Sequence, residues 1–135
     1  MPIEHIEIVW PNIKDFIHGA AEYTFGRFSA FDIKNELIRR GNEQQLWVAF
    51  EDKDNFYGAV ITEVYEYPQI SALIMHFTGG KRLSKWKKPM LELLQKFARD
   101  NNCSVIESYG RPGWGKVFEK DGYKQRFIFY ELPVE

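Results

Sequence analysis

The chain has 135 residues, 44% of them hydrophobic and 16% aromatic, with a formal net charge of −1. This composition predicts one domain over residues 1–135 with a single packed core, and it excludes a disordered chain and a globally basic nucleic-acid-binding protein. The only cysteine, Cys103, excludes an intramolecular disulfide. With one cysteine and no His-x-x-x-His spacing, we also expect no metal site.

Hydropathy along the chain gives no membrane or secretion signal. The longest uncharged apolar run, residues 70–77, is far shorter than a membrane span. Residues 1–10 carry charged side chains and lack the apolar core of a signal peptide. We therefore expect a cytoplasmic protein without a membrane partner.

The N-terminal part of the chain predicts a strand followed by a helix. Apolar side chains alternate over residues 6–10, which is typical of a short strand, and Pro11 follows directly. Residues 13–24 then place apolar side chains at helical spacing. We expect this helix to stop near Gly26, because glycine is a common residue just after a helix end.

A second helix and three strands are expected next. Ser29 and Asp32 have the spacing of a capping box, which predicts a helix start, and Gly41 is a typical helix end. The expected strands are residues 46–50, 56–65 and 70–77. Their short connections predict an antiparallel meander.

The second half of the chain predicts a helix, a strand, a short helix and a final strand. The first helix is amphipathic, starts between residues 83 and 88 and ends at Asn101. We expect Pro89 in or near its first turn, because a proline deeper in a helix costs about 3 kcal/mol. The later elements are expected at residues 104–109, 112–120 and 125–132. The fold class is therefore mixed α/β (α+β), with helices packed on a central, mostly antiparallel sheet.

A loop of glycines and basic residues lies at the start of the amphipathic helix. Gly79 and Gly80 precede a run of cations with no acid among them: Lys81, Arg82, Lys85, Lys87 and Lys88. A helix N-terminus carries unpaired N–H groups and partial positive charge, so the loop is suited to an anion such as phosphate. The alternatives are a solvated, charged helix end and a nucleic-acid contact in which Trp86 stacks on a base.

The order of these elements over the whole chain resembles the GCN5-related N-acetyltransferase (GNAT) superfamily. The sharpest match is residues 117–123, Val-Phe-Glu-Lys-Asp-Gly-Tyr, which are similar to the late F-Y-E-K-x-G-F segment of that family. Residues 110–114 resemble the R-x-G-W segment of small GNAT-like proteins from phages and prophages.

The resemblance implies a V-shaped opening between the third meander strand and the strand after the long helix. Acetyl-CoA would lie in this opening as co-substrate, and an amine of unknown identity would be the acceptor. The cofactor-binding residues implied are Phe77, Gly79, Gly80, Lys81, Arg82 and Ser84. The catalytic residues implied are His76, Glu107 and Tyr109.

Each catalytic candidate also has a structural interpretation. His76 or Glu107 would deprotonate the acceptor amine, and His76 could instead be a hydrogen-bonded histidine of the sheet. Glu107 and Tyr109 alternate along one strand and share a face, so either could hold the amine or relay a proton. Tyr109 would protonate the leaving thiolate. Ordinary strand side chains would give the same pattern.

Two departures from the family pattern leave two hypotheses open. The pyrophosphate motif Arg/Gln-x-x-Gly-x-Gly/Ala is absent, and Phe118 stands where the family has its general-acid tyrosine. The first hypothesis is an acyl-CoA-dependent N-acyltransferase of phage or prophage type. The alternative is a catalytically inactive GNAT-like phage protein, structural or bound to a protein partner in a phage assembly, in the host cytoplasm or the virion.

Overall fold

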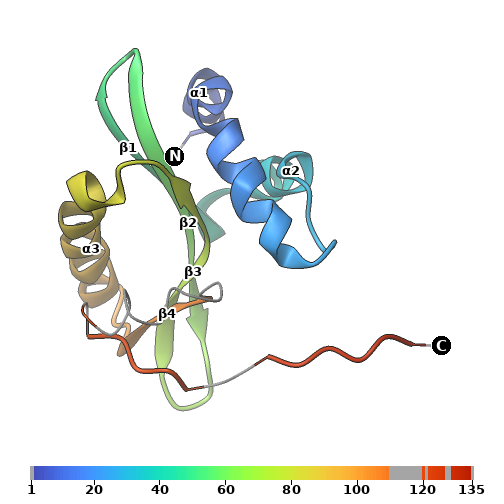
Figure 1. Cartoon of the computed structure of the whole chain (residues 1–135). Helices are drawn as coiled ribbons and strands as arrows, with labels where there is room; N and C mark the ends of the chain where they lie inside the picture. The colour runs from blue at the N-terminus through green and yellow to red at the C-terminus, as the bar shows by residue number, and fades with distance from the viewer. Residues whose placement is uncertain (1, 110–119, 121, 127–128, 135) are drawn as a thin grey trace.

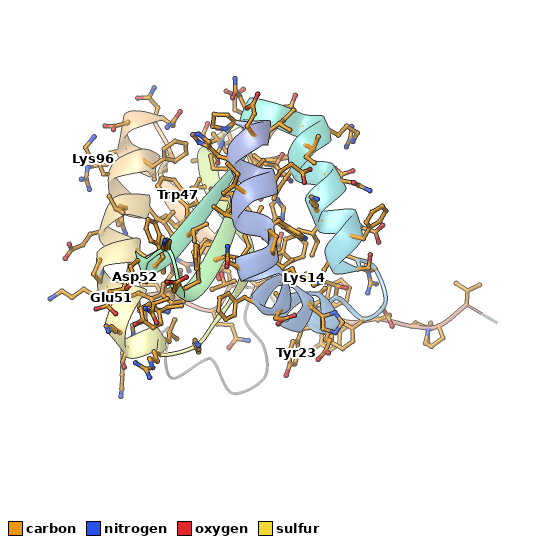
Figure 2. All side chains as sticks on the ribbon, turned by 90° about the horizontal axis from the view of Figure 1, so that it is seen from above. Lys14, Tyr23, Trp47, Glu51, Asp52 and Lys96 are labelled. Carbon is orange, nitrogen blue, oxygen red and sulfur yellow. The ribbon has the colours of Figure 1, made fainter. Side chains whose placement is uncertain are left out.

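The computed structural model describes residues 2–109, 120, 122–126 and 129–134. Its described strands form one sheet, in which they are hydrogen-bonded in their order along the chain. Helices α1 (Ile3–Ala21) and α2 (Ala30–Arg40) cover one face of this sheet, and α3 (Leu83–Asp100) covers the other (Figure 1). Seen from above, Lys96 on α3 and Lys14 on α1 therefore lie on opposite sides of the molecule (Figure 2). The expected mixed α/β class is confirmed.

The meander predicted from the sequence is confirmed. β1 (Gln44–Asp52), β2 (Asn55–Glu66) and β3 (Ser71–Gly80) pair as antiparallel neighbours. β4 (Val105–Ser108) then pairs with β3 in the parallel direction, after the chain has crossed over through α3. The strand expected at residues 104–109 is therefore present at the edge of the described sheet.

The sheet separates two apolar cores. The α1/α2 core includes Ile13, Ile17, Ile33, Leu37 and Ile61. The α3 core includes Val60, Leu73, Trp86, Met90 and Leu94. Strand β2 supplies both, because consecutive side chains of a strand point to opposite faces.

The strand expected at residues 6–10 is wrong, because these residues belong to α1. Ile6 and Trp10 are four positions apart, a spacing that puts them on one face of a helix as well as on one face of a strand. In the structure both are buried in line with Ile13 and Ile17 on the sheet-facing side of α1. One helix therefore replaces the predicted strand and the predicted later helix.

Two prolines lie inside helices, against expectation. Pro11 is within α1, and Pro89 is within α3 beyond its first turn. A proline there leaves the carbonyl four residues earlier without its helical partner. These carbonyls belong to Glu7 and Lys85, which are exposed, as are both prolines, so water can satisfy them. Exposure explains why neither proline ends its helix.

Both ends of α2 follow the sequence prediction. Ser29 Oγ accepts a hydrogen bond from the Asp32 N–H at 3.1 Å, and Asp32 Oδ2 accepts one from the Ser29 N–H at 2.9 Å. This is the capping box expected from the spacing. Gly41 ends the helix with a φ of 55°.

The C-terminal predictions have mixed outcomes. Residues 112–119 of the expected short helix lie outside the described residues. The final strand expected at 125–132 is wrong for its described residues, 125–126 and 129–132, which form no ladder. The contacts found there are with the loop before α2: Arg27 pairs with Glu131 at 2.7 Å, and its guanidinium lies 5.3 Å from the Phe129 ring centroid.

Close packing of β3 on α1 gives a stability prediction. A Cβ at Gly79 would lie 2.1 Å from the carbonyl oxygen of Phe16, a backbone atom that cannot rotate away. We expect Gly79→Ala to destabilise the fold by about 1–3 kcal/mol, the usual cost of overpacking. The control is Gly19→Ala in α1, where a Cβ meets nothing within 4 Å and should gain up to about 1 kcal/mol. Urea unfolding would measure both, and equal stabilities would contradict this packing.

Candidate functional site

Strands β3 and β4 separate partway along β3. Their parallel pairing runs from Ala72 to Met75 on β3 and stops at Ser108 on β4. Beyond Met75, β3 continues to Gly80 with β2 as its ladder partner. In the described chain, the ladder between β3 and β4 therefore ends before residues 76–80. This is where the V-shaped opening was expected.

A β-bulge places His76 at the point of separation. Residues 61–62 of β2 pair with Phe77 and Met75, so His76 is an extra residue in β3. A bulge interrupts the strict alternation of side chains and often lies beside an active site. As a result Phe77 packs against the α1/α2 core, and His76 contacts Glu63 on the same face.

Glu63 joins His76 to a cation from α2. His76 Nε2 lies 2.7 Å from Glu63 Oε1. The second oxygen, Glu63 Oε2, accepts a hydrogen bond from Arg40 Nη2. Arg40 is the last residue of α2, and its Nε also donates to Glu43 Oε2 at 3.2 Å. The Glu63 side chain is only 12% exposed, so a nearly buried carboxylate has a hydrogen-bond partner at each of its oxygens.

The charge state of Glu63 follows from two opposing effects. Burial favours the neutral acid, but the hydrogen bonds from Arg40 and His76 outweigh it, and the pKa of Glu63 is lowered from its ordinary value. Glu63 is therefore an anion at neutral pH. Sequence reasoning did not predict that Glu63 and Arg40 pair beside His76; the available signal for Glu63 was its place as a lone carboxylate in the apolar run of β2.

The structure brings Tyr109 to His76 but engages Glu107 elsewhere. The Tyr109 and His76 rings are nearly parallel, at 19°, with centroids 6.4 Å apart. Glu107 Oε1 instead accepts a hydrogen bond from the Tyr67 hydroxyl at 2.9 Å. This bond raises the pKa of Tyr67 to about 12, because ionising the phenol would place two negative charges together.

Gly79 and Gly80 have a packing reason to lack side chains. Gly79 lies against the Phe16 backbone, and a Cβ at Gly80 would be 2.4 Å from the Tyr57 carbonyl oxygen. The Lys81 N–H donates to that same carbonyl at 2.7 Å. Their assignment as phosphate contacts stays a prediction, since close packing alone accounts for both glycines.

The N-terminus of α3 keeps donors available. Arg82 precedes the helix in the left-handed region, with a φ of 53°, and gives no side-chain cap. The N–H groups of Leu83 and Ser84 lie in the first turn, where no helical carbonyl can accept them. These groups and the helix dipole are suited to an anion, and the anion site at this loop stays a prediction.

Part of the positive charge at this loop is already compensated. Lys85 Nζ lies 3.5 Å from Glu51 Oε2 and 3.3 Å from the Tyr57 hydroxyl. The Arg82 guanidinium lies 5.8 Å from the Tyr57 ring centroid. A hydrogen bond from Tyr57 and the charge of Lys85 lower the pKa of Glu51. Glu51 and Tyr57 were not singled out from the sequence, because they meet α3 only in the folded sheet.

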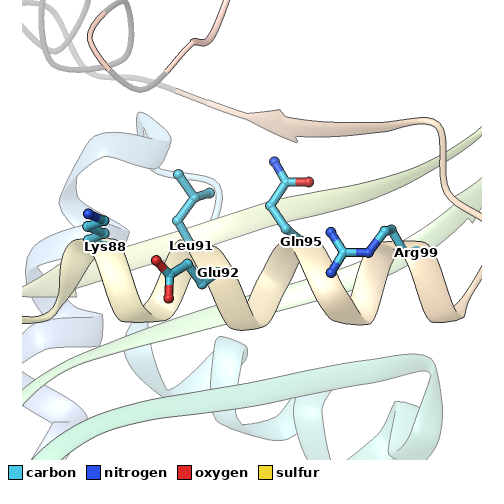
Figure 3. Close-up of a pocket in the computed structure, with 5 residues that line it drawn as sticks. All are labelled: Lys88, Leu91, Glu92, Gln95 and Arg99. Carbon is cyan, nitrogen blue, oxygen red and sulfur yellow. The ribbon is translucent and has the colours of Figure 1, made fainter.

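An open groove runs along another face of α3. It has a volume of about 420 Å³, and Figure 3 shows its lining side chains on successive turns: Lys88, Leu91, Glu92, Gln95 and Arg99. The groove is not lined by any residue of the cluster formed by His76, Glu63, Arg40 and Tyr109. The groove therefore has no part in the chemistry of that cluster.

Other site types find no support in the part of the chain that the structure covers. Among the described residues, no three or more His, Cys, Asp or Glu side chains are placed to hold one metal ion. Among the same residues, no helix combines the length and apolarity needed to cross a membrane.

Solved structures match the whole chain, although no protein-family model and no curated protein does. A probable acetyltransferase matches with a TM-score of 0.72 and 17% identity, covering 100% of this chain and 95% of its own. A ribosomal-protein-alanine N-acetyltransferase from Brucella melitensis biovar Abortus 2308 gives 0.68 and 15%, covering 99% and 96%. A predicted acetyltransferase from Clostridium acetobutylicum, with acetyl-CoA, gives 0.67 and 17%, covering 98% and 92%.

These matches show that the chain has the GNAT fold, as its element order implied. At these identities the shared property is the fold. The segment that resembles phage proteins, residues 110–114, and the substituted position Phe118 lie outside the described residues. Their interpretation stays as the sequence gives it.

The bond between Tyr67 and Glu107 gives a pH prediction. The neutral phenol is stabilised in the folded state, so its contribution is complete below the unfolded pKa near 10 and is lost as the pH rises to about 12. NMR titration of ring-labelled tyrosine should show Tyr67 ionising near 12 and returning toward 10 in Glu107→Gln. The control Glu66→Gln should leave it unchanged. A wild-type Tyr67 that ionises near 10 would contradict the bond.

Proposed function

We propose that this protein is an acetyl-CoA-dependent N-acetyltransferase that transfers the acetyl group directly to an amine. The observation that carries the proposal is the separation of β3 from β4 at His76, close along the chain to the N-terminus of α3. A strand edge from which the neighbouring strand has separated is suited to hydrogen-bond an extended chain such as pantetheine, and the helix start can hold phosphate.

Acetyl-CoA would be held by backbone and cations along residues 77–84. The backbone at Phe77 would pair with pantetheine. Lys81, Arg82 and Ser84 would hold the phosphates, with Gly79 and Gly80 shaping the turn beside them. Lys85 already pairs with Glu51, so we expect Lys81 and Arg82 to be the main cations of this loop that hold the phosphates.

The reacting groups would come from the ends of β3 and β4. His76 would accept a proton from the acceptor ammonium, which is the role its imidazole suits near neutral pH. Glu107 would hold the ammonium through the oxygen that Tyr67 does not occupy. Tyr109, beside His76, would give a proton to the departing thiolate. It would thus supply the hydroxyl group that Phe118 lacks.

The first test is calorimetric titration of the protein with acetyl-CoA. Acyltransferase function predicts heat of binding at concentrations up to about 1 mM, the usual upper range for enzyme substrates. Absence of binding at that concentration would end the enzyme proposal. The inactive GNAT-like interaction protein of phage or prophage origin would then be the better explanation.

The second test reverses the charge of the loop. The double change Lys81→Glu/Arg82→Glu should weaken acetyl-CoA binding by about tenfold or more, because each charge-assisted hydrogen bond is worth about 1.5–3 kcal/mol. The control Lys14→Glu/Lys96→Glu makes the same change in net charge on other elements (Figure 2). Equal affinity of the two double variants in titrations would remove this loop from the site.

A further inference from the structure

Glu63 and Arg40 have no assigned part in the proposed reaction. The buried polar residues of the described chain are Gln44, Thr62 and Glu63, and of these only Glu63 is ionisable. A buried ion pair is weak evidence for stability, because taking both charges out of water costs about as much as their attraction returns. The arrangement therefore calls for a reason beyond stability.

The carboxylate of Glu63 determines where the proton of His76 lies. An ionised carboxylate only accepts hydrogen bonds, so the contact between Glu63 Oε1 and His76 Nε2 at 2.7 Å requires a proton on Nε2. A neutral imidazole carries one ring proton, and its lone pair is then on Nδ1. Among the described residues, no group makes a hydrogen bond to Nδ1.

The orientation of the His76 ring is also fixed. Arg40 binds the other oxygen of Glu63, so the carboxylate cannot turn away from His76 without losing its cation. Tyr109 stacks near one side of the imidazole, and the Phe77 ring lies 6.1 Å from it, centroid to centroid. The imidazole is therefore fixed at Nε2 and flanked by rings.

We propose that Glu63, held by Arg40, is a positioning residue that fixes His76 as its Nε2–H tautomer, so that Nδ1 is the atom that accepts the proton of the acceptor ammonium. The inference rests on the proposed function, in which His76 is the base. It is the same logic by which a carboxylate orients a catalytic histidine in other enzymes.

The proton steps balance as follows. The ammonium gives one proton to Nδ1, and the amine lone pair attacks the thioester carbonyl carbon. The carbon–nitrogen bond forms, the carbon–sulfur bond breaks, and its electron pair leaves on sulfur. A second proton passes from nitrogen to the thiolate, through Tyr109. The imidazolium of His76 then releases its proton to water.

The first arm of the test needs no ligand. Long-range ¹H–¹⁵N spectra of the full chain, labelled at histidine and recorded where imidazoles are neutral, report which ring nitrogen carries the proton. His76→Gln assigns the signals against His5 and His18. We expect the Nε2–H tautomer in the wild type and a mixture in Glu63→Gln, whose amide can donate as well as accept.

A wild-type His76 found as the Nδ1–H tautomer, or as a mixture, would overturn the proposal. So would an unchanged tautomer in a folded Glu63→Gln variant. The wild-type spectrum decides by itself if Glu63→Gln does not fold.

The second arm measures acetyl transfer from acetyl-CoA to a panel of primary amines by thiol release. Glu63→Gln should lower kcat by roughly 10²-fold while leaving KM for acetyl-CoA unchanged. The control Glu66→Gln, on an exposed carboxylate of the same strand, should keep full activity. Full kcat in Glu63→Gln would remove the positioning role. Failure of the wild type to bind acetyl-CoA would instead remove the proposed function and leave the tautomer result standing.

Discussion

The antiparallel ladder between β2 and β3 is the constraint on which the other features depend. β2 is buried on both faces, with Val60 in one core and Ile61 in the other, so a slip of one residue would exchange the two cores. The bulge at His76 shifts the register of β3 against β2 by one residue at this single position. Beyond it the alternation of β3 is reversed, which turns Gly79 toward α1 and Gly80 toward Trp86. The same bulge therefore sets the position of the histidine and requires the small residues after it.

The charges beside the bulge connect the helices to the sheet. The capping box at Ser29 fixes where α2 begins. The length of α2 then places its last residue, Arg40, beside Glu63 of β2. Without Arg40, burial would raise the pKa of Glu63, and a protonated carboxyl group can donate a hydrogen bond to His76 as well as accept one. The positive charge of Arg40 on α2 thus favours Glu63 as the acceptor in its hydrogen bond with His76 on the sheet. This dependence is visible only when the helix and the strands are considered together.

Local signals predicted the elements that depend on local chemistry. The capping box, the meander, α3 and the strand after it all follow from turn residues and periodicity. The strand expected at residues 6–10 was wrong because the spacing of Ile6 and Trp10 fits both a helix and a strand. The position expected for Pro89 was wrong because the sequence does not show that this residue is exposed. His76 was found from its place at the end of an apolar strand. The pairing of Glu63 with Arg40 beside it was not predicted, because it depends on the register of β2 and on the direction of α2.

The end of β3 is held on every side that the described chain reaches. His76 is fixed to Glu63, Gly79 rests on the Phe16 backbone, and the Lys81 N–H is bound to the Tyr57 carbonyl. The stretch between the first two of these points lies beyond the ladder that β3 forms with β4. A rigid edge of this kind loses little entropy when an extended ligand pairs with it, and it keeps the imidazole at a constant distance from that ligand. Fixing the end of β3 at His76 and at Gly79 thus relates the packing of the two cores to the precision that the proposed proton transfer at His76 requires.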